Sequence, residues 1–386
     1  MTDVGPDAAP YPRFSDGEMA RRHGALAAEM AAADVDHAIV YGANRSGSAV
    51  GWLTRWPVTR EALAVVTPGE PDLLLVNFYN HVPNARRIAG EAEVRWAGPR
   101  PMASAIEELR RRGGAGRRIG LIGPLGYRPH AELAAFAGPV PLDAAYTRLR
   151  LRKSDEEIDW LRAGASLTDR AVRALREEAG PGVDERELGN IAERAYVGRG
   201  GTTHIHYFGA TAMAAPELSV PAQWPAARPL ARGDALTCEV SASFWDYSGQ
   251  LLRTFAVGAD PPPLYRELHE VADAAFDAIV ERLRPGASAA EVVEASSMIE
   301  ESGFTIRDDL LHGFVGGYLP PVLGSRSRAL EEVPDFTFEA GMTVVVQPNV
   351  VTSDERAGVQ TGELVLVGEA GAERLHEHER GFLRLG

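Results

Sequence analysis

The chain has 386 residues, a length that suits two or three domains, each large enough for a full hydrophobic core. Its composition, 45% hydrophobic and 24% charged, is that of an ordinary globular protein. The formal net charge of −14 argues against a surface for nucleic acid or for an anionic membrane, because both would repel it.

The chain has one cysteine, Cys238, so no disulfide can form within it. Cys238 lies in an apolar stretch without a basic neighbour, which favours an inert buried thiol over a nucleophile. Residues 1–16 lack the pattern of a signal peptide, and no stretch approaches the roughly 18 apolar residues of a membrane helix. We therefore expect a cytoplasmic protein.

The first 150 residues alternate between predicted helices and strands. Helices are expected over 19–33 and 102–112. The expected strands are 36–41, 61–67, 72–76 and 118–122. Strands that alternate with helices indicate an α/β domain.

A domain boundary is predicted near residue 150. Ser154 is a good N-cap and Glu157, three residues on, completes a capping box, so a long helix begins there. Gly180 ends this helix, and a second helix follows. The sequence therefore divides into domains 1–150 and 151–386.

The second domain has two helix pairs, and each pair is followed by strands. After the first pair, strands are expected at 202–211, 234–243 and 249–257. The second pair is expected at 262–283 and 288–302, followed by strands at 304–315, 342–351 and 359–367. This order indicates an α+β domain.

Residues 233–258 carry the most informative motif. They read as a strand, a turn and a second strand, with Glu239 and Gln250 eleven residues apart and Arg253-Thr254-Phe255 at the end. This motif resembles that of the pita-bread family, which holds aminopeptidase P, prolidase, methionine aminopeptidase and creatinase. Residues 51–54 resemble the N-terminal domain of creatinase and prolidase. The resemblance implies an α/β N-terminal domain followed by an α+β pita-bread domain.

The resemblance also implies which residues stand at the family's five metal-ligand positions. Its two aspartates correspond to Glu239 and Gln250. Its histidine corresponds to His312, and its two glutamates to Gln347 and Gly362. Two neighbouring divalent cations need several anionic oxygen ligands, which this set lacks. We therefore expect no metal, no other cofactor and no dinuclear metallopeptidase activity.

Titratable groups near these positions can still supply acid–base chemistry. Strand alternation places Glu239 and Gln250 on neighbouring strands that face one pocket. His204 and His206 are two residues apart, so we expect both on one face, opposite the carboxylate. Catalytic roles are predicted for Glu239, His206, His204 and His312. Substrate-binding roles are predicted for Gln250, Gln347, Asn349, Glu217, Tyr207, Tyr247, Tyr318 and Gln360.

Structural roles remain open for several of these residues. Glu239 could instead form an ion pair with Arg253, because a carboxylate in an apolar layer needs a cation, a donor or a proton. Either histidine could be hydrogen-bonded within the fold. Glu217 could stand in for the histidine that the family has in the preceding loop, or be an exposed turn carboxylate.

The leading prediction is a metal-independent, creatinase-like enzyme that acts on a small polar or cationic molecule by acid–base chemistry. The reaction would be C–N hydrolysis, or a lyase, cyclase or isomerase step. One alternative is a non-catalytic binding or scaffold protein, and another is a mononuclear metalloenzyme that uses Glu239, His312 and one further histidine. The resemblance implies a homodimer in which Trp52, Leu53 and Arg55 reach toward the partner.

Overall fold

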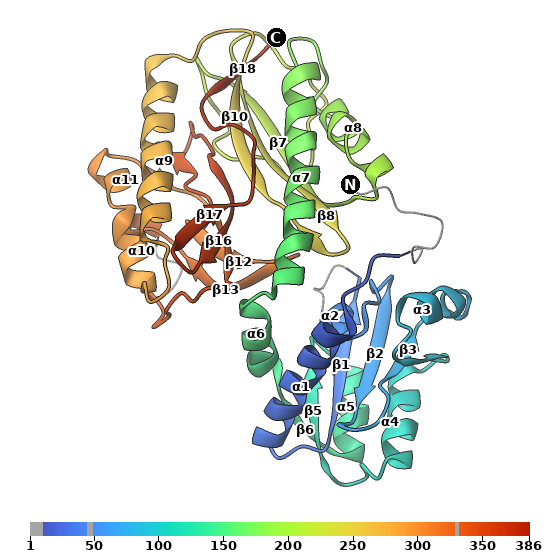
Figure 1. Ribbon diagram of the computed structural model, residues 1–386. Helices are drawn as coiled ribbons and strands as arrows, with labels where there is room; N and C mark the ends of the chain where they lie inside the picture. Colours follow the sequence, from blue (N-terminus) through green and yellow to red (C-terminus); the bar gives the residue numbers. More distant parts are fainter. Residues whose placement is uncertain (1–10, 45–48, 329–331) are drawn as a thin grey trace. The chain divides into compact units, whose positions relative to one another are not determined.

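The computed structural model describes residues 11–44, 49–328 and 332–386. The chain separates into two compact units, Met1–Arg150 and Leu151–Gly386 (Figure 1). Among the described residues, no helix is both long and apolar enough to cross a bilayer.

The first unit is an α/β domain, as predicted. Its described residues form a six-stranded mixed sheet in the order β4-β3-β2-β1-β5-β6. The strands are β1 (His37–Ala43), β2 (Glu61–Val66), β3 (Leu73–Val76), β4 (Glu93–Trp96), β5 (Arg118–Ile122) and β6 (Gly138–Pro141). The helices are α1 (Asp16–Ala32), α2 (Ala49–Thr54), α3 (Val82–Ile88), α4 (Pro101–Arg111), α5 (Tyr127–Phe136) and α6 (Asp143–Leu151). Apolar residues of β1, β2 and β3 pack with α4 and α5 in one core.

Two residues that were expected to reach toward a partner subunit are part of this unit's core. Trp52 is 3% exposed and its ring packs edge-on against Tyr146. Leu53 is 1% exposed. Both side chains are covered by their own chain, so the prediction that they contact a partner is wrong. The reason is that α2 packs into its own unit, which buries Val50 and Thr54 as well.

The second unit is an α+β domain built on a large, mainly antiparallel sheet (Figure 1). Its described residues place seven strands in the order β13-β12-β14-β16-β10-β8-β7, while β17, β18 and β9 pair with β16, β10 and β8. The central strands are β7 (Thr202–Ala212), β8 (Asp234–Phe244), β10 (Leu251–Val257), β12 (Leu311–Phe314), β14 (Thr343–Val346) and β16 (Gly362–Gly368). The others are β9 (Tyr247–Ser248), β11 (Thr305–Ile306), β13 (Tyr318–Leu323), β15 (Val350–Val351), β17 (Gly371–Arg374) and β18 (Leu383–Leu385).

Helices cover one face of this sheet. They are α7 (Asp155–Glu178), α8 (Glu187–Arg194), α9 (Pro263–Arg282), α10 (Ala289–Ala295) and α11 (Met298–Glu301). The capping box predicted at the start of α7 is present: Ser154 accepts from the backbone of Glu157, and the Glu157 side chain accepts from the backbone of Ser154. Apolar residues of α7 and α8 pack against β7, β8 and β10, among them Cys238, which is the buried thiol expected.

The strand predicted over 304–315 is broken in the structure. Only β11 and β12 are extended, and residues 307–310 form a turn between them. The side-chain oxygen of Asn349 accepts hydrogen bonds from the backbone N–H groups of Arg307 and Asp308, at 3.0 and 3.1 Å. These backbone N–H groups, which would bond to a neighbouring strand if the strand continued, are therefore satisfied by a side chain 41 residues away from Asp308. The break in the strand brings Asp308 and Asp309 beside the sheet.

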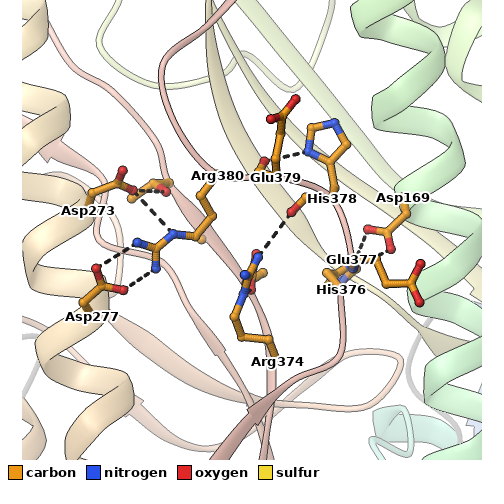
Figure 2. A network of polar contacts seen from close by, with 12 residues as sticks. Asp169, Asp273, Asp277, Arg374, His376, Glu377, His378, Glu379 and Arg380 are labelled. Atoms are coloured by element: carbon orange, nitrogen blue, oxygen red, sulfur yellow. Dashed lines mark hydrogen bonds and ion pairs between the residues drawn. The ribbon is translucent and has the colours of Figure 1, made fainter.

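The C-terminal segment 374–380 lies between α7 and α9 in a network of polar contacts (Figure 2). His376 is hydrogen-bonded to Asp169 of α7 at 2.9 Å. Arg380 makes a two-pronged contact with Asp277 of α9 at 2.5 and 2.9 Å. Arg374 pairs with Glu363, the fully buried carboxylate of β16. These contacts fasten the end of the chain across the helix-covered face.

Glu363 also pairs with Arg253 at 2.8 Å, and both side chains are at most 1% exposed. We expect Glu363→Gln to lower the free energy of unfolding by about 3–5 kcal/mol, because it leaves the buried Arg253 charge uncompensated. Urea denaturation of the full chain measures this. Asp277→Asn is the control: its side chain is 66% exposed, so its pair with Arg380 should contribute at most about 1 kcal/mol. Equal effects of the two substitutions would contradict a special role for the buried pair.

Candidate functional site

Strand alternation gives the large sheet two chemically different faces. Residues directly opposite each other on antiparallel strands point to the same side. Glu239 of β8 lies opposite Leu252 of β10 and opposite Tyr207 of β7. The neighbouring residues Cys238 and Val240 belong to the helix-covered core. Glu239 and Tyr207 therefore lie on the other face, which we call the open face.

Glu239 is buried on the open face, 8% exposed, and accepts a 2.6 Å hydrogen bond from Nε2 of Gln250. Burial raises the pKa of Glu239 to about 8, and the nearby charges of Asp308 and Asp309 add to the shift, while the Gln250 hydrogen bond opposes it. Glu239 is therefore mainly a neutral carboxylic acid near pH 7. The predicted proximity of Glu239 and Gln250 is confirmed.

Glu239 does not pair with Arg253. The guanidinium of Arg253 bonds to Glu363 and to the backbone carbonyls of Leu252 and Gly362 on the helix-covered face. Arg253 lies opposite Cys238, so alternation turns it away from Glu239. The structural ion pair that the sequence left open is thus absent between these two residues.

His312 forms the second centre of the open face. It is fully buried, and its Nδ1 donates to Asp309 Oδ1 at 2.9 Å. The Tyr318 hydroxyl donates to Asp309 Oδ2 at 3.0 Å, and the Tyr318 ring stacks on the imidazole with centroids 3.8 Å apart. Since Nδ1 carries the proton, the neutral imidazole has its lone pair on Nε2. This geometry is that of a histidine oriented by a carboxylate.

Gln347 and Asn349 hold the turn that carries Asp309. Gln347 Nε2 donates to Asp309 Oδ1 at 3.1 Å. Asn349 accepts from the backbone of the same turn, as described above. Burial raises the pKa of Asp308, and the charge of Asp309 adds to this shift. Both amides, predicted to bind substrate, thus also position the carboxylate that orients His312.

Several buried polar atoms around this site have no hydrogen-bond partner among the described residues. They are Ser241 Oγ, Gln250 Oε1, His312 Nε2, Gln347 Oε1, Asn349 Nδ2 and Gln360 Oε1. A buried polar atom without a partner costs free energy, so such atoms are rare unless a ligand or water satisfies them. Four of these atoms belong to His312, to Gln250, which contacts Glu239, and to Gln347 and Asn349, which contact the turn of Asp309. They match a ligand that offers both donors and acceptors, such as an amide.

The predicted partnership of His206 with Glu239 is wrong. His206 lies opposite Val240, on the helix-covered face, and its Nε2 is hydrogen-bonded to the Tyr196 hydroxyl at 2.8 Å. Burial lowers the pKa of His206. The cause is the register of β7: Tyr207 pairs with Glu239, so alternation turns His206 to the other face. A β-bulge between Thr203 and Ile205 interrupts the alternation just before this stretch.

The same bulge separates His204 from His206. The His204 ring lies edge-on to Phe314, with centroids 5.8 Å apart, and Phe314 in turn contacts the ring of His312. His204 therefore lies near the rim of the site, although the two histidines do not share a face as the sequence predicted. Tyr207, opposite Glu239, is on the open face as expected.

Two predicted substrate contacts, Tyr247 and Glu217, are placed differently. Tyr247 is buried and donates to the carboxylate of Glu157 at 2.8 Å, so it ties β9 to the start of α7. Glu217 is exposed on its loop, which is the alternative that the sequence left open for it. Gln360 is buried, and its backbone N–H donates to Thr254 Oγ1 at 2.6 Å, beside the open face.

Sequence reasoning missed Asp308 and Asp309. Both lie in a stretch that was predicted as strand, and their partners are distant in sequence. The adjacent pair Asp308-Asp309, three residues before His312, was the available signal. Its importance follows only from the break in the strand.

The five positions that the family resemblance implies as metal ligands do not fit two divalent cations. Gln250 and Gln347 are neutral, and His312 directs one nitrogen to Asp309. At Gly362 a Cβ atom would lie 2.8 Å from the Gln347 Cα and 2.6 Å from the Val346 carbonyl oxygen, so no ligand side chain fits there. Within the described ranges, no three His, Cys, Asp or Glu side chains are grouped to hold a metal.

Comparisons with known proteins agree with the resemblance seen in the sequence. The family model described as metallopeptidase family M24 matches residues 159–369, more than half of the chain. Xaa-Pro dipeptidase from Pyrococcus furiosus is 26% identical over 243 residues, which are 63% of this chain and 68% of that protein. Xaa-Pro dipeptidase from Pyrococcus horikoshii is 24% identical over 248 residues, 63% of this chain and 67% of its own.

Solved structures share the fold over nearly the whole chain. Xaa-Pro dipeptidase from Bacillus anthracis superposes with a TM-score of 0.80 at 19% identity, and covers 95% of this chain and 100% of its own. X-Pro aminopeptidase from Thermotoga maritima gives 0.81 at 15% identity, with 94% and 99% covered. The predicted pita-bread fold with its α/β N-terminal domain is confirmed.

These comparisons contradict the predicted function. The relatives are named Xaa-Pro dipeptidases, whereas the sequence was interpreted as a creatinase-like enzyme for a small polar or cationic molecule. That prediction is wrong, and the relatives give no support to its alternative of a scaffold protein. The error came from treating the altered metal-ligand positions as evidence about the substrate. Metal ligands and substrate-binding residues are different sets of side chains.

The raised pKa of Glu239 predicts how stability depends on pH. The folded protein holds a proton on Glu239 up to about pH 8, whereas the unfolded chain releases it near the ordinary value of 4.5. This contribution to stability is therefore complete below pH 4.5 and is lost as pH rises to about 8. Relative to wild type, Glu239→Gln should become steadily more stable across this window, by up to about 1.4 kcal/mol per pH unit.

Urea denaturation of both proteins at about pH 5, 6.5 and 8 tests this, since groups that titrate in both proteins cancel. Glu217→Gln, at an exposed carboxylate, should show a flat difference and serves as the control. A difference between Glu239→Gln and wild type that does not change with pH would show that Glu239 is ionised throughout.

Proposed function

The chain belongs to metallopeptidase family M24, and from this membership we propose that it is a hydrolase that cleaves short peptides. The names of the relatives, Xaa-Pro dipeptidases, support the substrate class. We further propose that the chain's own acid–base groups carry the reaction without a dinuclear metal centre. That part rests on the residues at the family's metal-ligand positions. Two neutral amides and a glycine stand where a dinuclear centre would need anionic oxygen ligands.

The observation that carries this proposal is the buried Asp309–His312 pair beside a neutral Glu239. The imidazole is fixed by two contacts, the Asp309 hydrogen bond and the stacked Tyr318 ring. Its Nε2 has no partner among the described residues. A buried, oriented imidazole with a free lone pair is suited to act as a general base. The carboxylate of Asp309 would keep the tautomer and stabilise the imidazolium once it forms.

In the proposed reaction, His312 Nε2 takes a proton from a water molecule while the water oxygen attacks the peptide carbonyl carbon. The carbonyl π electrons move onto the carbonyl oxygen, and the protonated carboxyl of Glu239 donates a hydrogen bond to it. The C–N bond then breaks, and His312 returns its proton to the departing nitrogen. One peptide bond and one water are consumed, and a carboxylic acid and an amine are formed.

The amide side chains supply contacts that suit a peptide. Gln250 and Gln347 each use one amide N–H within the protein and leave an oxygen without a partner among the described residues. Asn349 uses its oxygen and leaves its NH₂ group. Such oxygens can accept from peptide N–H groups, and the NH₂ group can donate to a peptide carbonyl.

The test is an assay of purified protein against Xaa-Pro and proline-free dipeptides, with product release followed by mass spectrometry, in chelator and again with added Mn²⁺. We expect cleavage in chelator. His312→Gln should lower kcat/KM by roughly 10²–10⁴-fold, the usual contribution of a general base. The rate should fall as pH rises through about 8, where Glu239 ionises, and Glu239→Gln should remove this fall.

Glu217→Gln is the matched control and should keep kcat/KM within about twofold of wild type, because its carboxylate is exposed on a loop. Cleavage that appears only with Mn²⁺ and stops in chelator would overturn the metal-free mechanism while keeping the peptide substrate. Failure to cleave any dipeptide under both conditions would overturn the proposed activity.

A homodimer and a cytoplasmic location stay predictions. The single cysteine is a buried free thiol, which suits a reducing compartment. Multi-angle light scattering at micromolar protein should give about twice the 41.5 kDa mass of the chain. Since Trp52 and Leu53 are buried within their own subunit, replacing Leu53 should unfold the first unit rather than only separate subunits. A mass near that of one chain would contradict the dimer.

A further inference from the structure

The first unit contains a cavity of about 400 Å³ that is separate from the site described above. It is formed by α1, the end of α2, the turn between β2 and β3, and the turn between α3 and β4 (Figure 1). Its apolar lining includes Met19, Ala27, Leu53, Val66 and Pro68. All lining residues belong to the first unit, so the cavity is a property of that domain alone.

Arg55 is the unusual residue of this cavity. Its backbone has φ 62°, in the left-handed region that residues with a side chain rarely adopt. Its side chain is only 8% exposed, and burial lowers its pKa. The closest carboxylate oxygen, on Glu91, is 3.6 Å away, and no hydrogen bond joins the guanidinium to another described residue. The fold therefore holds a desolvated cation with unused donors, at a strained backbone position.

Two other charged residues that line the cavity, His23 and Asp72, pair closely with each other. His23 donates from Nδ1 to the Met19 carbonyl and from Nε2 to Asp72, both at 2.8 Å. The carbonyl and the carboxylate can only accept hydrogen bonds, so both ring nitrogens carry a proton and His23 is an imidazolium. The hydrogen bond with Asp72 raises the pKa of His23. Glu70 lies 3.5 Å from Arg112. Arg55 is thus the cavity cation whose charge is least compensated.

We propose that this cavity binds a small molecule with one carboxylate and an apolar body. The planar guanidinium of Arg55 matches a carboxylate in a two-pronged contact, and the apolar lining suits a short hydrocarbon or aromatic body. A phosphate would bring about two negative charges close to Glu70, Asp72 and Glu91, which disfavours it. The proposal is independent of peptide hydrolysis at His312.

Gly24 of α1 gives a way to block the cavity without disturbing the fold. It lines the cavity, and a Cβ atom built on it meets nothing within 4 Å. A leucine there would occupy the mouth of the cavity. The same change removes a glycine from a helix interior, which favours folding rather than opposing it.

The experiment titrates the full chain with 3-phenylpropanoate and hexanoate, and with the matching amides 3-phenylpropanamide and hexanamide, by calorimetry and ligand-observed NMR. We expect saturable binding of the carboxylates and at least tenfold weaker binding of the amides. Arg55→Gln, which removes the charge and keeps a branched polar end, should weaken carboxylate binding at least tenfold. Gly24→Leu should abolish it.

Two further variants test whether binding is specific to this cavity. Arg55→Gly relieves the positive φ, so it should fold at least as stably as wild type while losing carboxylate binding. His312→Gln should leave carboxylate binding unchanged, whereas Arg55 and Gly24 variants should leave peptide hydrolysis unchanged. The proposal is overturned if neither carboxylate binds, if the amides bind equally well, or if binding survives in Arg55→Gln or Gly24→Leu.

Discussion

The ion pair between Arg253 and Glu363 is the constraint on which the second unit depends. Both side chains are at most 1% exposed, and they join β10 to β16 at the centre of the large sheet. Buried charges are tolerated only when they are paired and hydrogen-bonded, and Arg253 also donates to four backbone carbonyls. Glu363 also pairs with Arg374. This second pair connects the ion pair to segment 374–380, which contacts both α7 and α9 (Figure 2).

This arrangement also sets the chemistry of the opposite face. Gln250 precedes Arg253 by three residues and Gly362 is next to Glu363, so strand alternation turns both to the open face. The charged side chains of the ion pair on β10 and β16 thus lie on the helix-covered face. On the open face, these two strands present an amide and a glycine. Glu239 lies on that face, and its burial, together with the charges of Asp308 and Asp309, raises its pKa.

Family membership and the site chemistry therefore answer different questions. The family model matches most of the second unit, and the similar proteins are named Xaa-Pro dipeptidases, which bears on the kind of substrate. The proposed reacting groups depend on a few positions, where this chain has a His312–Asp309 hydrogen bond and neutral amides at two positions of the family's anionic ligands. A fold can keep its substrate class while its catalytic groups change, because binding and chemistry depend on different side chains.

The sequence by itself determined the features that depend on neighbouring residues. The capping box at Ser154, the strand at 118–122 and the proximity of Glu239 to Gln250 all follow from short-range patterns, and all are present. The resemblance of residues 233–258 identified the family for the same reason. Tertiary structure alone decided the rest. The register that pairs Tyr207 with Glu239 turned His206 to the helix-covered face, and a bulge after Thr203 separated it from His204. An amide at position 349 broke a predicted strand to bring Asp309 to His312. Strand alternation is a local rule that holds only while the strand is regular. A bulge, or a break held by a residue far along the chain, changes which face the following side chains occupy.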